Sequence, residues 1–281
     1  MRRIIFFILC SVLLSVFAFS TEKGPKEIKG KHFIVYYYAG SEGFANEVLT
    51  KAEEYYVSIA KDLGYERYSE FWLWDKRVKI YIYPDHESYL KASSMPYWSH
   101  GMADYRNKVI MSYLRGKGFI TSILPHEMTH LMFRDFVGFT GEIPLWLDEG
   151  VAQWEEKAKR NMNYIIKDAF RKKIVLSLHD MMKMDIRNIK GDDKIYVRYT
   201  KDGDTPLILV LTGKNLINLY YVEAVSLVGF LIKKYGSKKF TSFCRELRYG
   251  KSVEAALRAV YSSYFTTLDG LEKEWKKYYL Q

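Results

Sequence analysis

Apolar and polar residues alternate along the first half of the chain in patterns that predict a small sheet crossed by a long helix. Residues 33–38 form a β-rich run, and residues 78–83 alternate between apolar and more polar side chains, which indicates a strand with one buried face. Between them, residues 44–63 carry apolar side chains at helical spacing, and Gly64 ends the pattern. A further strand is expected over residues 107–113. Strand, helix, strand and strand predict an α/β unit.

After Gly118 the pattern becomes mainly helical. Helices are expected over residues 119–135, 144–158, 160–180 and 220–235, with at least two more before the C-terminus. The segment 185–218 differs because it is rich in turn residues, and it predicts two hairpin strands, Ile195–Tyr199 and Leu207–Leu211. We expect a second, helical lobe, in which this hairpin could act as a lid at the mouth of a cleft.

The composition is that of a folded globular protein. Among 281 residues, 48% are hydrophobic and 27% are charged, which excludes a disordered, collagen-like or low-complexity chain. Two cysteines form neither a disulfide framework nor a thiolate metal site. The formal net charge is +10, and the basic residues are spread singly and in pairs, which is typical of solvated helix faces and not of a nucleic-acid groove. A basic protein favours anionic envelope surfaces or acidic substrates.

The first twenty residues have the pattern of a secretory signal peptide. Arg2 and Arg3 precede the apolar run Ile4–Phe19, and cleavage is expected after Ser20. The alternative is an uncleaved membrane anchor, although this run is shorter than the roughly 20 residues that span a bilayer. Cleavage removes both arginines, leaving a net charge of +8, and one of the two cysteines. The remaining thiol, Cys244, is expected to be a small buried hydrophobe.

A His-Glu-x-x-His motif carries the candidate chemistry. His126 and His130 are four residues apart, so on a helix their Cβ atoms lie about 5–6 Å apart on one face, and both imidazoles can reach one metal ion. Glu127 then lies beside the open coordination position, where a general base can take a proton from water that the metal activates. The alternative is a solvent-facing helix with two uninvolved histidines.

A second feature favours the metal site. Glu149 follows His130 after eighteen residues, and Pro144 suits the first turn of a new helix. A short loop with glycines lets that helix fold back, so that Glu149 reaches the two histidines as a third ligand. Two histidines and one glutamate with an open fourth position form a catalytic zinc arrangement.

The motif and its context, Trp-Leu-Asp-Glu-Gly-Val-Ala at residues 146–152, resemble the gluzincin metallopeptidases, the clan of thermolysin and aminopeptidase N, and most closely the peptidase MA-like domain proteins. In the family, the two motif histidines and the downstream glutamate bind zinc, and the motif glutamate is the catalytic base. The resemblance carries these roles onto His126, His130, Glu149 and Glu127.

The resemblance also implies a fold. It covers residues 30 to 280 and is strongest at 119–156 and 221–236. It implies an α+β, zincin-like, two-lobed metallopeptidase. We expect an N-terminal lobe at residues 21–143, with a small twisted sheet and the motif helix, and a mainly helical C-terminal lobe at residues 144–281.

The family pattern also bears on the transition state and the substrate. In the aminopeptidase branch, a tyrosine that opens a helix donates its phenol to the oxyanion, which the resemblance carries onto Tyr221. Tyr221 also shares an apolar stripe with Val225 and could be core, and Tyr220 is its neighbour. The Gly-x-Met-Glu-Asn strand of the aminopeptidases is replaced by Gly-Met-Ala-Asp at residues 101–104. This departure favours an endopeptidase or a peptidase of narrow specificity, and His100 is a weaker candidate for substrate contact.

Together, these features predict an exported Zn²⁺-dependent peptidase that hydrolyses peptide bonds with Glu127 as general base. The expected partner is a peptide or protein lying extended along residues 107–113 as an edge strand, with peripheral contact to an anionic envelope surface and no nucleic acid. The alternative is a non-catalytic exported zincin-fold protein that binds cell-envelope polymer or a protein partner.

Overall fold

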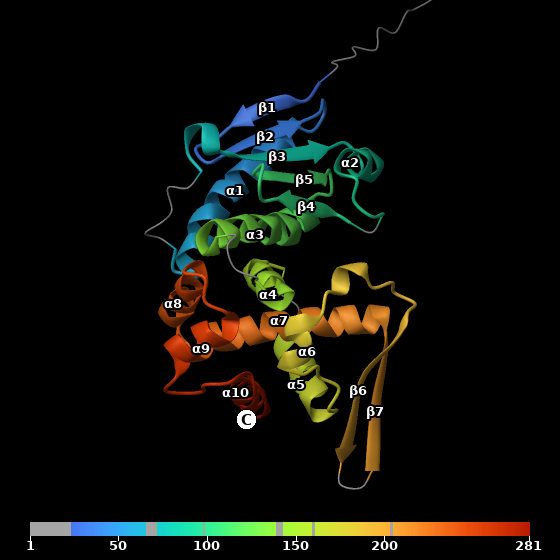
Figure 1. Cartoon of the computed structure of the whole chain (residues 1–281). Helices are drawn as coiled ribbons and strands as arrows, with labels where there is room; N and C mark the ends of the chain where they lie inside the picture. Colours follow the sequence, from blue (N-terminus) through green and yellow to red (C-terminus); the bar gives the residue numbers. More distant parts are fainter. Residues whose placement is uncertain (1–23, 66–71, 98, 139–142, 159–160, 203–204) are drawn as a thin grey trace, which may run out of the picture.

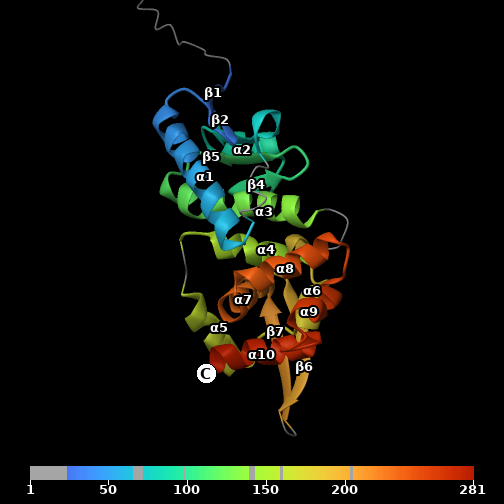
Figure 2. The ribbon, with the colours of Figure 1, turned by 90° about the vertical axis from the view of Figure 1, so that its left-hand side faces the viewer.

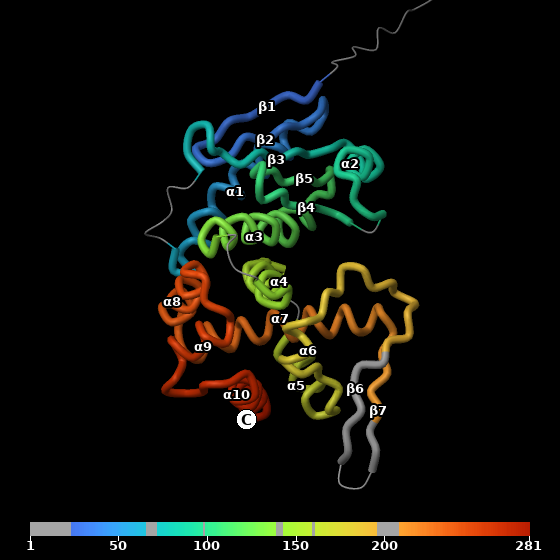
Figure 3. The backbone as a smooth tube through the Cα atoms, in the orientation of Figure 1, coloured from blue at the N-terminus to red at the C-terminus, as the bar shows by residue number. Residues whose placement is uncertain are grey.

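The structure is a computed structural model that describes residues 24–65, 72–97, 99–138, 143–158, 161–202 and 205–281. The predicted signal peptide, residues 1–20, lies outside the described residues, so its cleavage stays a prediction. For residues 196–202 and 205–207 the backbone alone is described. Figure 3 follows the chain from the sheet, in blue to green, to the helices of the second half, in yellow to red.

A five-stranded mixed sheet occupies one end of the molecule (Figure 1). Its strands stand in the order β1-β2-β3-β5-β4, and the central three run parallel. The bounds are β1 Lys26–Lys29, β2 Phe33–Tyr37, β3 Val78–Tyr83, β4 Gly101–Asp104 and β5 Val109–Tyr113. The three strands expected from the sequence are confirmed as β2, β3 and β5.

The expected edge strand is not at the edge. Strand β5 pairs with β3 on one side and with β4 on the other, so the prediction that residues 107–113 form the free edge is wrong. Residues 101–104 form the antiparallel strand at this end of the sheet instead. The turn that reverses the chain is closed by Asp104, which accepts hydrogen bonds from the backbone N–H groups of Arg106 and Asn107, and by Lys108 at φ 53°.

The helices near the sheet pack against its apolar face. Val35, Ile80 and Ile110 on the central strands are fully buried. Helix α1 (Glu42–Asp62) packs on β2 and on α3 (Leu124–Val137), and α3 also packs on β4. The short helices are α2 (His86–Ser93), the 3₁₀ turn η2 (Trp74–Lys76) and the π-helical turn η3 (Phe119–Ile123) that leads into α3.

The second half of the chain is mainly helical and lies at the opposite end of the molecule (Figures 1 and 2). Its helices are α4 Leu145–Glu155, α5 Met162–Arg171, α6 Leu178–Lys183, the 3₁₀ turn η4 Ile186–Asn188, α7 Gly213–Tyr235, α8 Ser237–Arg248, α9 Val253–Tyr261 and α10 Leu268–Leu280. The single helix expected over 160–180 is divided into α5 and α6, because the chain turns at Lys173, which has φ 57°. The mixed α+β class is confirmed.

The predicted hairpin is also confirmed. Strands β6 (Lys194–Asp202) and β7 (Thr205–Thr212) form a separate antiparallel pair that leads directly into α7. Its action as a lid stays a prediction.

Helix α7 begins earlier than the sequence indicated. The side chain of Thr212 accepts a hydrogen bond from the backbone N–H of Asn215 and caps a helix that starts at Gly213. The expectation that Tyr221 opens this helix is therefore wrong, since Tyr221 lies in its third turn. By length and composition α7 could cross a membrane, but 67% of the apolar window is buried inside the protein, as in the core helix of a soluble protein.

Candidate metal centre

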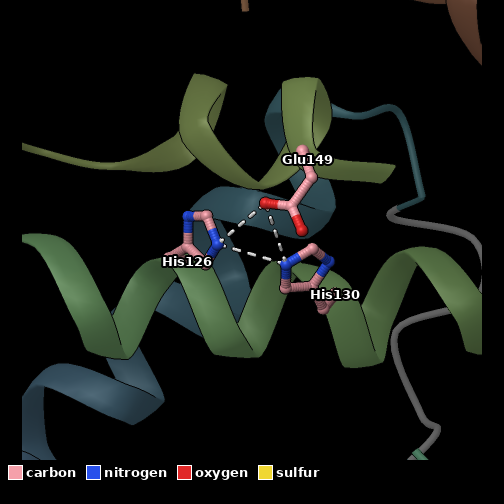
Figure 4. Close-up of side chains that lie close together, drawn as sticks. All are labelled: His126, His130 and Glu149. Atoms are coloured by element: carbon pink, nitrogen blue, oxygen red, sulfur yellow. Dashed lines mark hydrogen bonds and ion pairs between the residues drawn. The ribbon is translucent and has the colours of Figure 1, made fainter. Parts of the chain in front are cut away.

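Three side chains from two helices meet at one point between α3 and α4. His126 and His130 project from one face of α3, and Glu149 reaches them from α4 (Figure 4). The Nε2 atoms of the two histidines are 3.1 Å apart. Oε2 of Glu149 lies 3.5 Å from Nε2 of His126 and 3.8 Å from Nε2 of His130. The structure thus brings together the three residues that the sequence predicted as ligands.

These separations fit a single divalent ion. Two ligand atoms at about 2.1 Å from a tetrahedral ion are about 3.4 Å apart. The three measured separations, from 3.1 to 3.8 Å, lie on either side of this value. Two imidazoles and one carboxylate are also a donor set that zinc accepts. The three residues therefore satisfy both the geometry and the chemistry of a metal site.

The local sequence sets the positions of the two helices. The turn η3 continues into α3, and Pro125, which has no N–H to donate, lies at the junction where the π-helical turn changes to α-helix. In α4, the backbone N–H groups of Leu147 and Asp148 donate to the carbonyl of Pro144, which forms the first turn. The two helices pack against each other, and this contact places Glu149 over the motif.

Each of the two histidines also contacts a carboxylate through Nδ1, the ring nitrogen that does not face the other ligands. Oδ1 of Asp148 lies 3.1 Å from Nδ1 of His130, and its Oδ2 accepts a 2.7 Å hydrogen bond from Nη2 of Arg134. Oε1 of Glu156 lies 3.0 Å from Nδ1 of His126. When Nδ1–H donates to a carboxylate, Nε2 keeps its lone pair for a metal.

Asp148 and Glu156 had no predicted role. A signal was present for Glu156, since it follows Glu149 by seven residues and two helical turns return a side chain to the same face. Asp148 precedes the ligand directly, and nothing in the pattern shows which histidine nitrogen it meets.

Burial and charge give the carboxyl groups different pKa values. Burial raises the pKa of Asp148, but His130 and Arg134 outweigh it and hold this pKa at about 2. For Glu127 burial dominates and raises the pKa, although His126 and His130 lower it. A raised pKa makes the ionised carboxylate a stronger base, which suits a group that takes a proton from water.

Strand β4, at the end of the sheet, lies close to Glu127 at Gly101. A Cβ atom added to Gly101 would lie 3.5 Å from Oε1 of Glu127 and would overlap the side chain of Ile123. Since β4 is paired on its other side only, its free backbone groups lie beside the candidate base.

The two adjacent tyrosines of α7 have different surroundings. Tyr220 is fully buried, and its hydroxyl donates to the carbonyl of Met181 at 3.3 Å. Tyr221 is half-buried, and burial together with the carboxylates of Glu149 and Glu127 raises the pKa of its phenol. The hydroxyl of Tyr220 is thus bound to Met181, whereas Tyr221 lines a cavity together with Glu156.

A large cavity adjoins this centre. It has a volume of about 1250 Å³, and Glu156, Tyr221 and His100 are among its lining residues. The hydroxyl of Tyr113 pairs with Nδ1 of His100 at 2.9 Å, so this imidazole is fixed at the cavity. Tyr105 also had no predicted role, and its ring packs edge-on against His130 with 6.1 Å between centroids.

The fold and the site define an α+β protein with a candidate mononuclear metal centre. A family model, that of the peptidase MA superfamily, matches residues 210–281, which include α7 to α10 and Tyr221. This match supports the assignment of the chain to the gluzincin-like metallopeptidases and suggests peptidase activity. The matched residues do not include the helices that carry the three candidate ligands. No curated protein matches the chain.

Proposed function

We propose that this protein is an exported zinc-dependent peptidase that hydrolyses peptide bonds with Glu127 as general base. The observation that carries the proposal is the convergence of the ligand atoms of His126, His130 and Glu149 within 4.8 Å of one another, with Glu127 next to His126 in α3. A purely structural zinc site needs no base and closes its fourth position with a protein ligand.

Each residue has a defined part in the proposed reaction. His126, His130 and Glu149 would hold the zinc ion, which when bound polarises the scissile carbonyl and lowers the pKa of a coordinated water. Glu127 accepts a proton from the attacking water and passes it to the leaving amine, a task that fits its raised pKa. The Tyr221 hydroxyl donates a hydrogen bond to the oxyanion of the tetrahedral intermediate.

The substrate path follows from the sheet order. Since β5 is paired on both sides, we propose that an extended peptide adds to the free edge of β4. Gly101 lets the backbone of this edge lie next to Glu127. The sheet end (residues 21–143) and the helical end (residues 144–281) would then be the two lobes of a zincin-like enzyme.

The proposal includes export and a peptide or protein as the partner. Its support for export is the N-terminal pattern of two arginines, an apolar run and Ser20. The net charge of +8 that remains after removal of residues 1–20 favours peripheral contact with an anionic envelope surface. A non-catalytic binding protein is the less favoured alternative, because it gives no use for a half-buried Glu127 beside the three donors.

Digestion of a peptide library by the wild type and by Glu127→Gln tests the function. Glutamine keeps the size of the side chain but cannot take a proton, so the variant should retain zinc and its thermal stability and lose at least roughly 10²–10⁴-fold in rate. Metal content by mass spectrometry and cleavage sites by sequencing are the measurements. Equal cleavage by both proteins contradicts the proposal and indicates a contaminating protease.

A further inference from the structure

Arg187 lies in a segment that is attached to α4, which carries Glu149, and to α7, which carries Tyr221. Helix α6 and the turn η4 run from residue 178 to residue 188. The indole Nε1 of Trp146 donates to the sulfur of Met182 at 3.2 Å, and the hydroxyl of Tyr220 donates to the carbonyl of Met181. Trp146 lies about one helical turn before Glu149, and Tyr220 precedes Tyr221. The segment is therefore anchored beside the turns that carry a ligand and the candidate oxyanion donor.

The guanidinium of Arg187 is held in a fixed orientation by Asp185. Asp185 accepts hydrogen bonds from the backbone N–H, Nε and Nη2 of Arg187, at 3.0, 2.8 and 2.5 Å. The intervening Ile186 is only 3% exposed and fixes the turn in the core. This geometry occupies one edge of the guanidinium and leaves the Nη1 edge without a hydrogen-bond partner among the described residues.

The charge of Arg187 reaches the site. Asp185 is the largest cause of the raised pKa of the guanidinium, and the carboxylate of Glu149 and the phenol of Tyr105 raise it further. In the other direction, Arg187 opposes the rise in the pKa of Tyr221. Since 68% of the Arg187 side chain is exposed, the guanidinium is open to solvent.

A fixed guanidinium with one free edge is a receptor for a planar anion. Arginine presents its N–H groups in a rigid fork that matches both oxygens of a carboxylate. Asp185 binds only the Nε and Nη2 side of the Arg187 guanidinium, so the Nη1 side can still donate hydrogen bonds to a second carboxylate. The free edge, beside the centre and open to solvent, is thus available to the substrate.

We propose that Arg187 determines specificity by binding a carboxylate of the peptide substrate close to the scissile bond. This inference rests on the proposed peptidase function. A peptide offers such a carboxylate in two places, an aspartate or glutamate side chain and the free C-terminus. The chemistry of recognition is the same for both.

Four peptides that differ only in these groups test the proposal. A cleavable peptide is made with glutamate or glutamine next to the scissile bond, and each form carries a free or an amidated C-terminus. The wild type should prefer the carboxylate form by roughly 10- to 100-fold in kcat/KM, the size expected for one charge-assisted hydrogen-bonded pair. Preference for the side-chain carboxylate identifies an acid-specific endopeptidase, and preference for the free C-terminus alone identifies a carboxypeptidase.

Two variants assign the preference to its residue. Arg187→Gln should remove the preference for the carboxylate peptide. Arg187→Glu should reverse this preference in favour of a lysine-containing peptide. Lys190→Gln removes an exposed cation that follows this segment by two residues, and the preference should stay intact. Peptide binding to Glu127→Gln, with and without Arg187→Gln, measures the same discrimination without turnover. A wild type that cleaves all four peptides equally, or an Arg187→Gln protein with unchanged preference, overturns this inference alone. Absence of any zinc-dependent, Glu127-dependent cleavage overturns the proposed function instead.

Discussion

The backbone of Gly150 packs directly against the backbone carbonyl of Ala224, so that a Cβ atom on Gly150 would lie 2.5 Å from that oxygen. Gly150 follows Glu149 in α4, and Ala224 lies one helical turn after Tyr221 in α7. Gly229 of α7 allows a similar close contact with α4, since a Cβ atom there would lie 2.7 Å from the ring of Trp154. Two glycines thus let the helices that carry Glu149 and Tyr221 approach closely.

Gly150→Ala should therefore disturb both stability and the site. The added methyl group meets backbone that cannot move aside, and overpacking of this kind costs about 1–3 kcal/mol. The helices must separate, which shifts Glu149 relative to the two histidines. We expect a lower melting temperature and weaker zinc binding, measured by calorimetry and by competition with a chelator.

Gly43→Ala is the matched control for a helical glycine. Its Cβ would meet nothing within 4 Å, and alanine is the better helix former, so stability should stay the same or rise slightly. A Gly150→Ala protein as stable as this control would show that the two helices do not depend on the glycine.

Asp148→Asn tests the support behind His130. The amide keeps the size of the side chain but loses the charge that both Nδ1–H of His130 and Arg134 use. Loss of such an outer partner weakens metal binding by about 10- to 100-fold. Zinc affinity by chelator competition is the measurement, and Glu156→Gln gives the same test for His126. Unchanged zinc affinity in both variants would contradict a metal held through Nε2 of the two histidines.

Cys244 should be unreactive in the native protein. It is fully buried, and burial raises the pKa of its thiol to about 12, so at pH 8 almost none is thiolate. In protein lacking the first twenty residues it is the single thiol, and maleimide should label it only at the rate of unfolding. Val57→Cys, at a side chain that is 64% exposed, should label at once and serves as the control. Rapid labelling of the native thiol would contradict the packing of α8.

The metal centre was predictable from the sequence because helix geometry is local. The four-residue spacing of His126 and His130 places both imidazoles on one face whatever surrounds them. Pro144 indicated where the next helix starts, and that helix carries Glu149. The strands β2, β3 and β5 were predictable for the same reason, since alternation of side chains is read within one segment.

The rest depends on contacts between distant segments. The four residues of β4 have no alternation and become a strand by pairing with β5, so the true edge of the sheet was not visible. Asp148 contacts His130 and Arg134 only because α4 packs on α3 in one particular orientation. Arg187 had no motif at all, because its orientation comes from Asp185 and its position from the anchoring of α6. Gly213 interrupts the apolar pattern, which hid the first two turns of α7 although Thr212 caps them.

Tyr221→Phe separates a catalytic phenol from a packing residue. Phenylalanine keeps the ring and removes the hydroxyl, so the melting temperature should stay nearly unchanged. If the hydroxyl stabilises the oxyanion, kcat falls by roughly 10²–10³-fold with little change in KM, because the contact forms mainly in the transition state.

Tyr220→Phe is the neighbouring control, and the structure predicts the opposite pattern for it. Its hydroxyl bonds the buried carbonyl of Met181, and the loss of this bond costs about 1 kcal/mol. The variant should melt at a lower temperature and keep most of its kcat, since Tyr220 points into the core. Steady-state kinetics and thermal melts give kcat and the melting temperature of both variants. An active Tyr221→Phe protein beside an inactive Tyr220→Phe protein would remove Tyr221 from the reaction, because the hydroxyl that matters would then be the one that holds α6 in place.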